Sequence, residues 1–199
     1  MNFTEIYNEV LIITKRPDLD ARTRQAIRSA TIKAHHSDFY YKDIVEVPVQ
    51  FTEPFYLQSF LPTEVVPNFR MVKYVRLWNG GNDGDVGVFL DPIQIENSLD
   101  LYQQKKTNVF YMAGQLLQIR GACTVDKVLF GCYVDPIILP EANYSSWIAV
   151  SQPYAIVYEA ARQVFKSISY TEQANEYSTL VGEEYAELKL SSVESVPLT

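Results

Sequence analysis

Histidine and cysteine are scarce in this chain of 199 residues, which has two of each. Cys123 and Cys132 are too few to form a disulfide framework, so we expect two free thiols in a soluble intracellular protein. His35 and His36 are adjacent, so on a helix they project about 100° apart and cannot bind one metal ion together. The histidines therefore do not predict a metal centre.

Motifs of catalysis and nucleotide binding are missing as well. The chain contains no G-x-x-x-x-G-K-[ST], G-x-G-x-x-G, G-x-S-x-G or H-E-x-x-H pattern. Asp83 and Asp85, in the glycine-rich segment 79–87, could offer oxygen ligands to Ca²⁺. A hairpin turn explains the same segment without an ion, and the sequence does not decide between the two. We expect no enzyme and no cofactor.

Long apolar runs are absent too. No run approaches the roughly 18–20 residues of a membrane span, and the opening "MNFTEIYNEV" lacks the cationic leader of a secretory signal. The net charge of -7 and the pI near 4.9 argue against a free nucleic-acid-binding protein and against binding to an anionic membrane. We therefore expect no membrane partner.

The charge that is present is unevenly distributed. Between residues 15 and 42, seven basic residues stand against three acidic ones, whereas from residue 141 onward eight acidic residues stand against three basic ones. This polarity would favour head-to-tail contacts between copies of the chain.

Three zones of different periodicity follow one another along the chain. The first is helical, with a capping box predicted from Asn2 and Glu5 and a break at Pro17. The second alternates apolar and polar residues in short stretches punctuated by prolines, which is typical of antiparallel strands. The third is helical again and begins with a helix for which Ser151 is the predicted cap.

This order predicts an α+β fold in which N- and C-terminal helical hairpins form a four-helix bundle. The antiparallel β domain is inserted between the two hairpins. The predicted parts are a helical bundle domain (1–38 and 143–189), a β-rich insertion domain (39–142) and an extended C-terminal tail (190–199).

The stretch from residue 16 to residue 41 resembles a basic amphipathic helix. Its charges are compatible with DNA contact, with contact to an acidic protein surface or with a solvated face, but no base-reading motif accompanies them. Because the bundle accounts for its apolar side, we interpret its basic side as an interface to a neighbouring subunit or a partner. The predicted interface residues are Arg22, Arg24, Arg28, Lys33 and His36.

Two parts of the chain resemble the head-to-tail adaptor (connector) proteins of short-tailed bacteriophages. The stretches "TEIYNEVLIITKRPDL" and "AIRSATIKAHHSDFYYKDIVE" look like the opening of such proteins. The distal "PYAIVYEAARQVFKSISYTEQANEYSTLVGEEYAEL" is similar to their closing helices. The resemblance covers most of the chain and is weakest across residues 52–108.

The resemblance implies a non-enzymatic structural protein of the virion, located at the head–tail interface and assembled in the host cytoplasm. Such adaptors form a homo-oligomeric ring, usually a dodecamer, between the portal protein and the tail nozzle or tube. The ring extends the channel through which double-stranded DNA passes during ejection without sequence-specific binding. In similar proteins the C-terminal segment runs along the portal. This implies a portal-docking tail with the apolar anchors Leu188, Leu190, Val193, Val196 and Leu198.

Two other functions stay open. Another tail-completion or nozzle subunit would share the charge polarity and the aromatic content. A ligand- or sugar-binding β domain on a helical base would use "YVRLWNGGNDGD" as its binding loop, with Trp78 as the stacking platform.

Overall fold

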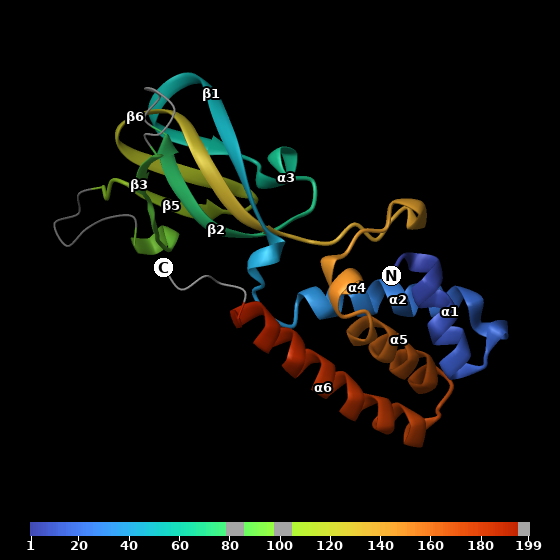
Figure 1. The fold of residues 1–199 in the computed structure, drawn as a ribbon. Helices are drawn as coiled ribbons and strands as arrows, with labels where there is room; N and C mark the ends of the chain where they lie inside the picture. Colours follow the sequence, from blue (N-terminus) through green and yellow to red (C-terminus); the bar gives the residue numbers. More distant parts are fainter. Residues whose placement is uncertain (79–85, 98–104, 195–199) are drawn as a thin grey trace. The chain divides into compact units, whose positions relative to one another are not determined.

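The computed structural model describes residues 1–78, 86–97 and 105–194 (Figure 1). By its internal contacts the chain divides into two compact units. The helical unit comprises Met1–Asp43 and Asp135–Thr199, and the β unit comprises Ile44–Val134. Each unit has its own cluster of buried apolar residues.

The first helix, α1 (Phe3–Thr14), begins with the predicted capping box, which is confirmed. The Glu5 N–H donates to Asn2 Oδ1 (2.9 Å), and the Asn2 N–H donates to Glu5 Oε2 (2.8 Å). These bonds satisfy two backbone donors at the helix start. The helix ends where Lys15 adopts a left-handed conformation with φ of 53°. A short 3-10 turn, η1 (Pro17–Leu19), then leads into α2 (Asp20–His35).

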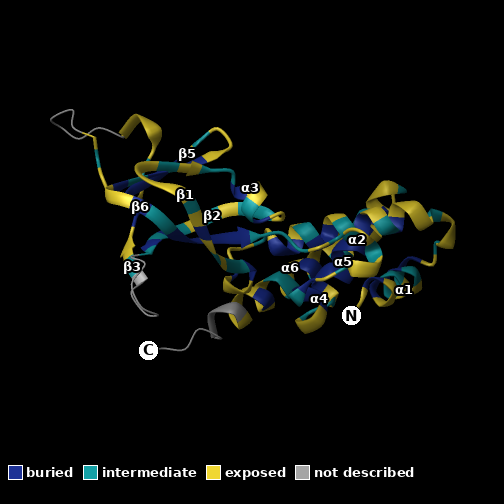
Figure 2. Ribbon diagram, turned by 90° about the horizontal axis from the view of Figure 1, so that it is seen from above, coloured by how far each residue is buried: buried dark blue, intermediate teal, exposed yellow. Residues whose placement is uncertain are grey.

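Helix α5 (Tyr154–Ser167) is the centre of the helical unit. Its buried residues include three in succession, Ala155, Ile156 and Val157, which span about 200° of the helix circumference. Consequently α1, α2 and α6 (Thr171–Glu194) all pack against α5. Figure 1 shows α5 between α6 and the pair formed by α1 and α2, and Figure 2 shows how much of α2 and α5 is buried.

The predicted four-helix bundle is wrong. The described residues form six α-helices, and α6 packs along α5 instead of completing a bundle of four equivalent helices. The physical reason is the apolar circumference of α5, which requires neighbours on several sides. Ser151 is the last residue of a separate short helix, α4 (Trp147–Ser151), and α5 begins only after Pro153.

The β unit is a six-stranded, mainly antiparallel sheet that curves until it is nearly closed, like a barrel. Its central strand is β6 (Leu116–Val134), along which β1 (Ile44–Phe60) pairs from Tyr133 to Leu117. β2 (Phe69–Trp78) pairs with the second half of β6, and β5 (Val109–Ala113) pairs with the first half. The remaining elements of this unit are α3 (Pro62–Val65), β3 (Val86–Phe89), β4 (Asp91–Pro92) and η3 (Ile95–Asn97).

The curvature of the sheet brings the two halves of β6 around a common aromatic core. The Phe60 ring, on a residue paired with Leu117, lies 5.2 Å from the Phe130 ring in the other half of β6. Gly114, with φ of 65°, makes the tight turn between β5 and β6. The insertion is therefore a nearly closed sheet with a core of its own.

None of the helices among the described residues is both long and apolar enough to cross a membrane.

Both cysteines are free thiols in the β unit, Cys123 exposed and Cys132 buried. Burial raises the pKa of the Cys132 thiol to about 11.

Candidate functional site

The arginines of α2 hold the segment before α4 in place. Arg24 Nη1 lies 2.5 Å from Glu141 Oε2, and Arg28 Nη2 contacts the other oxygen of the same carboxylate. Glu141 opens the 3-10 turn η4 (Glu141–Asn143). Arg24 also pairs with Asp20, at 3.0 Å. The Glu141 carboxylate therefore binds two successive turns of α2, although it lies more than 110 positions later in the chain.

Lys33 pairs with a carboxylate that is completely buried. Lys33 Nζ lies 2.8 Å from Glu159 Oε1, and the Arg162 guanidinium binds both Glu159 oxygens at 2.7 and 2.8 Å. Gln163 donates a further hydrogen bond of 3.0 Å. Burial alone raises the pKa of Glu159, but the hydrogen bonds from Arg162, Lys33 and Gln163 outweigh it and hold that pKa below its usual value. Glu159 is therefore a charged residue inside the helical unit.

The other two predicted interface residues also bind within the helical unit. Arg22 lies at a polar groove of about 300 Å³ between α2 and α5, where it donates a long hydrogen bond (3.4 Å) to the Ser167 carbonyl. His36 Nε2 lies 2.7 Å from Asp135 Oδ1. All five predicted residues, Arg22, Arg24, Arg28, Lys33 and His36, thus have partners in their own chain. Their role between subunits stays a prediction.

His35 lies at the centre of a buried polar network that the sequence did not reveal. Its Nδ1 is 2.8 Å from Asp43 Oδ1, and its Nε2 is 2.9 Å from Ser146 Oγ. Trp147 Nε1–H donates to the same Asp43 oxygen at 2.7 Å. The network joins the end of α2, the turn η2 (Tyr41–Asp43) and the start of α4.

This network has the connectivity of a serine hydrolase triad. However, His35 and Asp43 are 2% exposed and Ser146 is 7% exposed. Ser146 Oγ also accepts the Ala149 N–H at 3.3 Å, as the N-cap of α4. His35, Asp43 and Ser146 line neither the groove at Arg22 nor the larger groove on the β unit that is described below. We interpret the network as structural, because a nucleophile requires a path for its substrate.

Several cationic side chains, among them Arg70 at 5.5 Å from the Tyr133 ring centre, lie against aromatic rings of the β unit. Lys127 Nζ is 3.9 Å from the centre of the Trp78 ring, so one face of the predicted sugar-stacking platform is covered. Arg76 lies 5.1 Å from the Phe89 ring centre and pairs with Glu46 at 2.7 Å, and Lys73 lies near Tyr133.

The two acids of the predicted calcium segment, Asp83 and Asp85, are outside the described residues. Within the described ranges, no group of three or more histidines, cysteines or acids could hold a metal ion.

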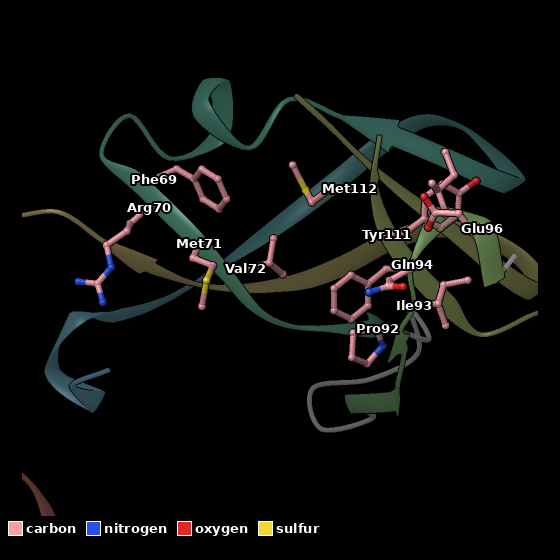
Figure 3. Close-up of a pocket in the computed structure, with 12 residues that line it drawn as sticks. Phe69, Arg70, Met71, Val72, Pro92, Ile93, Gln94, Glu96, Tyr111 and Met112 are labelled. Carbon is pink, nitrogen blue, oxygen red and sulfur yellow. The ribbon is translucent and has the colours of Figure 1, made fainter. Parts of the chain in front are cut away.

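A groove of about 740 Å³ opens on the β unit between the first residues of β2 and the last residues of β5 (Figure 3). Phe110, a core residue, and Val72 contribute apolar surface to it. Met71, Ile95 and Met112 also line it, and they are 43%, 50% and 41% exposed. The groove is therefore apolar and opens to solvent.

The predicted tail anchors fall into different environments. Helix α6 continues to Glu194, so residues 190–194 are helical where the sequence predicts an extended tail. Leu188 is completely buried in the helical core, whereas Leu190 is 67% exposed. Val193 belongs to α6, and Val196 and Leu198 lie outside the described residues. Leu188 is therefore a core residue in this structure.

Only one of the features missed by sequence reasoning carried a local signal. Glu159 is a single acid within the apolar run "AIVYEAA", and a lone charge on the buried side of a helix indicates a buried ion pair. The hydrogen bond between His35 and Ser146 joins residues 111 positions apart. The groove on the β unit depends on where neighbouring strands stop pairing. Neither has a signature in the local sequence.

Comparisons of the sequence with protein-family models and with curated proteins found no match.

Proposed function

We propose that this protein is a head-to-tail adaptor, a structural and non-enzymatic virion component. It forms a ring, expected to be a dodecamer, between the portal protein and the tail nozzle or tube. The ring extends the channel for double-stranded DNA without reading its sequence.

One observation carries this proposal. The stretches that resemble adaptor proteins lie at opposite ends of the chain, yet, apart from residues 44–46, they belong to the helical unit. There α1 and α2, from the first stretch, pack against α5, from the second. The two resemblances therefore describe one folded unit, which supports their common origin in one kind of protein.

Charge and the buried network also support a structural role. A net charge of -7 suits a conduit through which DNA passes, since a basic surface would retain the phosphates. The arrangement with triad connectivity found among the described residues, at His35, is buried within the helical unit. Both features favour a scaffold over a hydrolase.

Negative-stain electron microscopy of the purified protein mixed with the portal protein of the same phage tests the proposal. We expect a ring docked coaxially on the portal. A chain that stays monomeric in the presence of portal and binds saccharides instead would contradict the adaptor function and favour the ligand-binding alternative. A monomer in the absence of portal is compatible with the proposal, because the portal can template the ring.

A further inference from the structure

The sheet of the β unit has an open seam between β2 and β5. Along its outer edge, β2 pairs with β3 at Arg76 and Trp78, and the Val75 carbonyl accepts the Leu90 N–H at 2.9 Å. Along its outer edge, β5 pairs with β4 only at Val109 and Phe110. Among the described residues, no strand pairs with these outer edges at residues 69–73 of β2 or 111–113 of β5. The 740 Å³ groove lies at this seam.

The backbone of β5 presents hydrogen-bonding groups to the seam. The Phe110 carbonyl accepts the Ile93 N–H at 3.0 Å, and the Asn108 carbonyl accepts the Asp91 N–H at 2.9 Å. Along a strand, the N–H and C=O groups of alternate residues point to the same edge. The N–H and C=O of Met112 therefore point to the outer edge as well, beyond the end of β4.

The side chains of the seam suit an extended apolar strand. Both methionines other than Met1 line the groove, and the flexible thioether side chain adapts to varied apolar partners. The volume of 740 Å³ lies within the range of about 300–1,000 Å³ typical of binding pockets. Arg70 and Glu96 place opposite charges at the two ends of the groove (Figure 3).

We infer that the seam binds an extended segment of another protein, which adds a strand to the outer edge of β5. Alternate apolar side chains of this segment enter the groove, while its backbone pairs with Met112. A basic residue of the segment lies toward Glu96 and an acidic one toward Arg70. A main chain is the favoured occupant because it alone offers donors and acceptors at the spacing of a strand edge. The seam lies in the β unit, so this inference does not depend on the adaptor role.

Synthetic peptides of about eight residues test the inference on the full-length protein. The probe is a set of acetylated peptides of the pattern Lys-X-Thr-X-Thr-X-Ser-Glu, where X is Val, Ile, Leu or Phe, together with the same set with its charged ends exchanged. Binding is measured by fluorescence anisotropy. Amide hydrogen exchange locates the binding site, and we expect the Met112 amide to become protected. Peptides with N-methyl groups at alternate positions lack half of their strand donors and should bind about fivefold to tenfold more weakly.

Two substitutions of one residue separate backbone pairing from apolar contact. Met112→Pro removes an outward backbone donor without removing a bond to β6, so we expect about fivefold to tenfold weaker binding. Met112→Leu keeps the donor and an apolar side chain, so its affinity should stay within about twofold. Should Met112→Pro unfold the protein, Ile95→Lys tests the groove wall instead, with Val88→Lys on the exposed side of β3 as its control.

Three outcomes would overturn the inference. The first is that no peptide of either set binds. The second is that the N-methylated peptides bind as tightly as the parent set, which would indicate apolar adsorption only. The third is that the protein dimerises in the absence of peptide and Met112→Pro abolishes the dimer, which would identify the occupant as a second copy.

Discussion

Glu159 shows how a single charge can be accommodated in an apolar interior. Its carboxylate is completely buried, and three side chains from two helices bind it. A buried carboxylate is tolerated only where its partners replace the water it has lost. The side chains of Lys33 and Arg162 are 49% and 22% exposed. Water can therefore still hydrate their charges while they bind Glu159.

Replacing Glu159 should destabilise the helical unit in a pH-dependent way. We expect Glu159→Gln to lower the free energy of unfolding by about 2–3 kcal/mol at pH 7, measured by urea denaturation. Because the folded pKa of Glu159 lies below its usual value, the contribution of this residue is full above about pH 4.5 and is lost as the pH falls through the folded pKa. The difference between the wild-type protein and the variant should therefore shrink in acid.

Glu176→Gln is the matched control, since Glu176 lies exposed on α6. Its free energy of unfolding should stay within about 0.5 kcal/mol of wild type. An equal effect of both substitutions, or an effect of Glu159→Gln that grows in acid, would contradict the charged state assigned to Glu159.

The two thiols should differ in reactivity. With a pKa of about 11, only about one Cys132 thiol in a thousand is ionised at pH 8, and the side chain is also buried. Cys123 is exposed. Ellman's reagent should therefore react quickly with one thiol, and with the second only after denaturant is added. Cys123→Ser should remove the fast phase, and a fast phase that persists in this variant would show that Cys132 is accessible.

At the scale of elements, sequence patterns predicted what depends on neighbouring residues. The capping box of α1 follows from Asn2 and Glu5 alone, and the antiparallel strands follow from alternation and proline spacing. The predicted cap at Ser151 is wrong: a serine two residues before a proline resembles a helix start, whereas here it ends α4. A pattern of five residues is too short to reveal a separate helix.

Tertiary arrangement was less accessible to the sequence. The apolar spacing of α5 fits either one side of a bundle or the centre of a helix cluster, and only the full set of buried residues distinguishes them. The seam of the β unit likewise depends on where β3 and β4 stop pairing. The predicted basic interface had a sound local basis, but partners far along the chain, such as Glu141 and Glu159, cannot be assigned from spacing.

The His35 network should anchor α4 to the end of α2. Asp43→Ala removes the acceptor shared by His35 and Trp147 and leaves one buried and one half-buried donor, so we expect a loss of about 3 kcal/mol in the free energy of unfolding. Ser146→Ala removes an N-cap and one hydrogen bond, so its loss should be smaller, about 1–2 kcal/mol. A Trp78→Phe background leaves Trp147 as the sole indole, and its fluorescence reports the local change.

A serine-reactive fluorophosphonate distinguishes the structural interpretation of this network from a catalytic one. The buried Ser146 should not be labelled in the native protein. Native labelling that Ser146→Ala abolishes would show an accessible nucleophile and would contradict both the structural interpretation and the proposed non-enzymatic role.

At the scale of the whole molecule, the proposed attachment to the portal should be separable from folding. Among the described residues, Leu188 is the last along the chain in the buried cluster of the helical unit, and the described part of α6 extends to Glu194. We expect deletion of residues 195–199 to change the free energy of unfolding by less than about 0.5 kcal/mol. The same deletion should weaken portal attachment at least tenfold if Val196 and Leu198 are docking anchors, as measured by co-sedimentation with portal rings.

Substitutions within α6 also distinguish an effect on stability from an effect on the proposed portal attachment. Leu188→Ala should cost about 2–5 kcal/mol of stability, because it opens a cavity beneath α6. Leu190→Ala, on an exposed side chain, should leave the fold unchanged and reduce portal attachment if Leu190 contacts the portal. Attachment that survives both the 195–199 deletion and Leu190→Ala would place the portal-binding surface elsewhere on the molecule, and the α2 face at Arg22 and His36 would be the next to test.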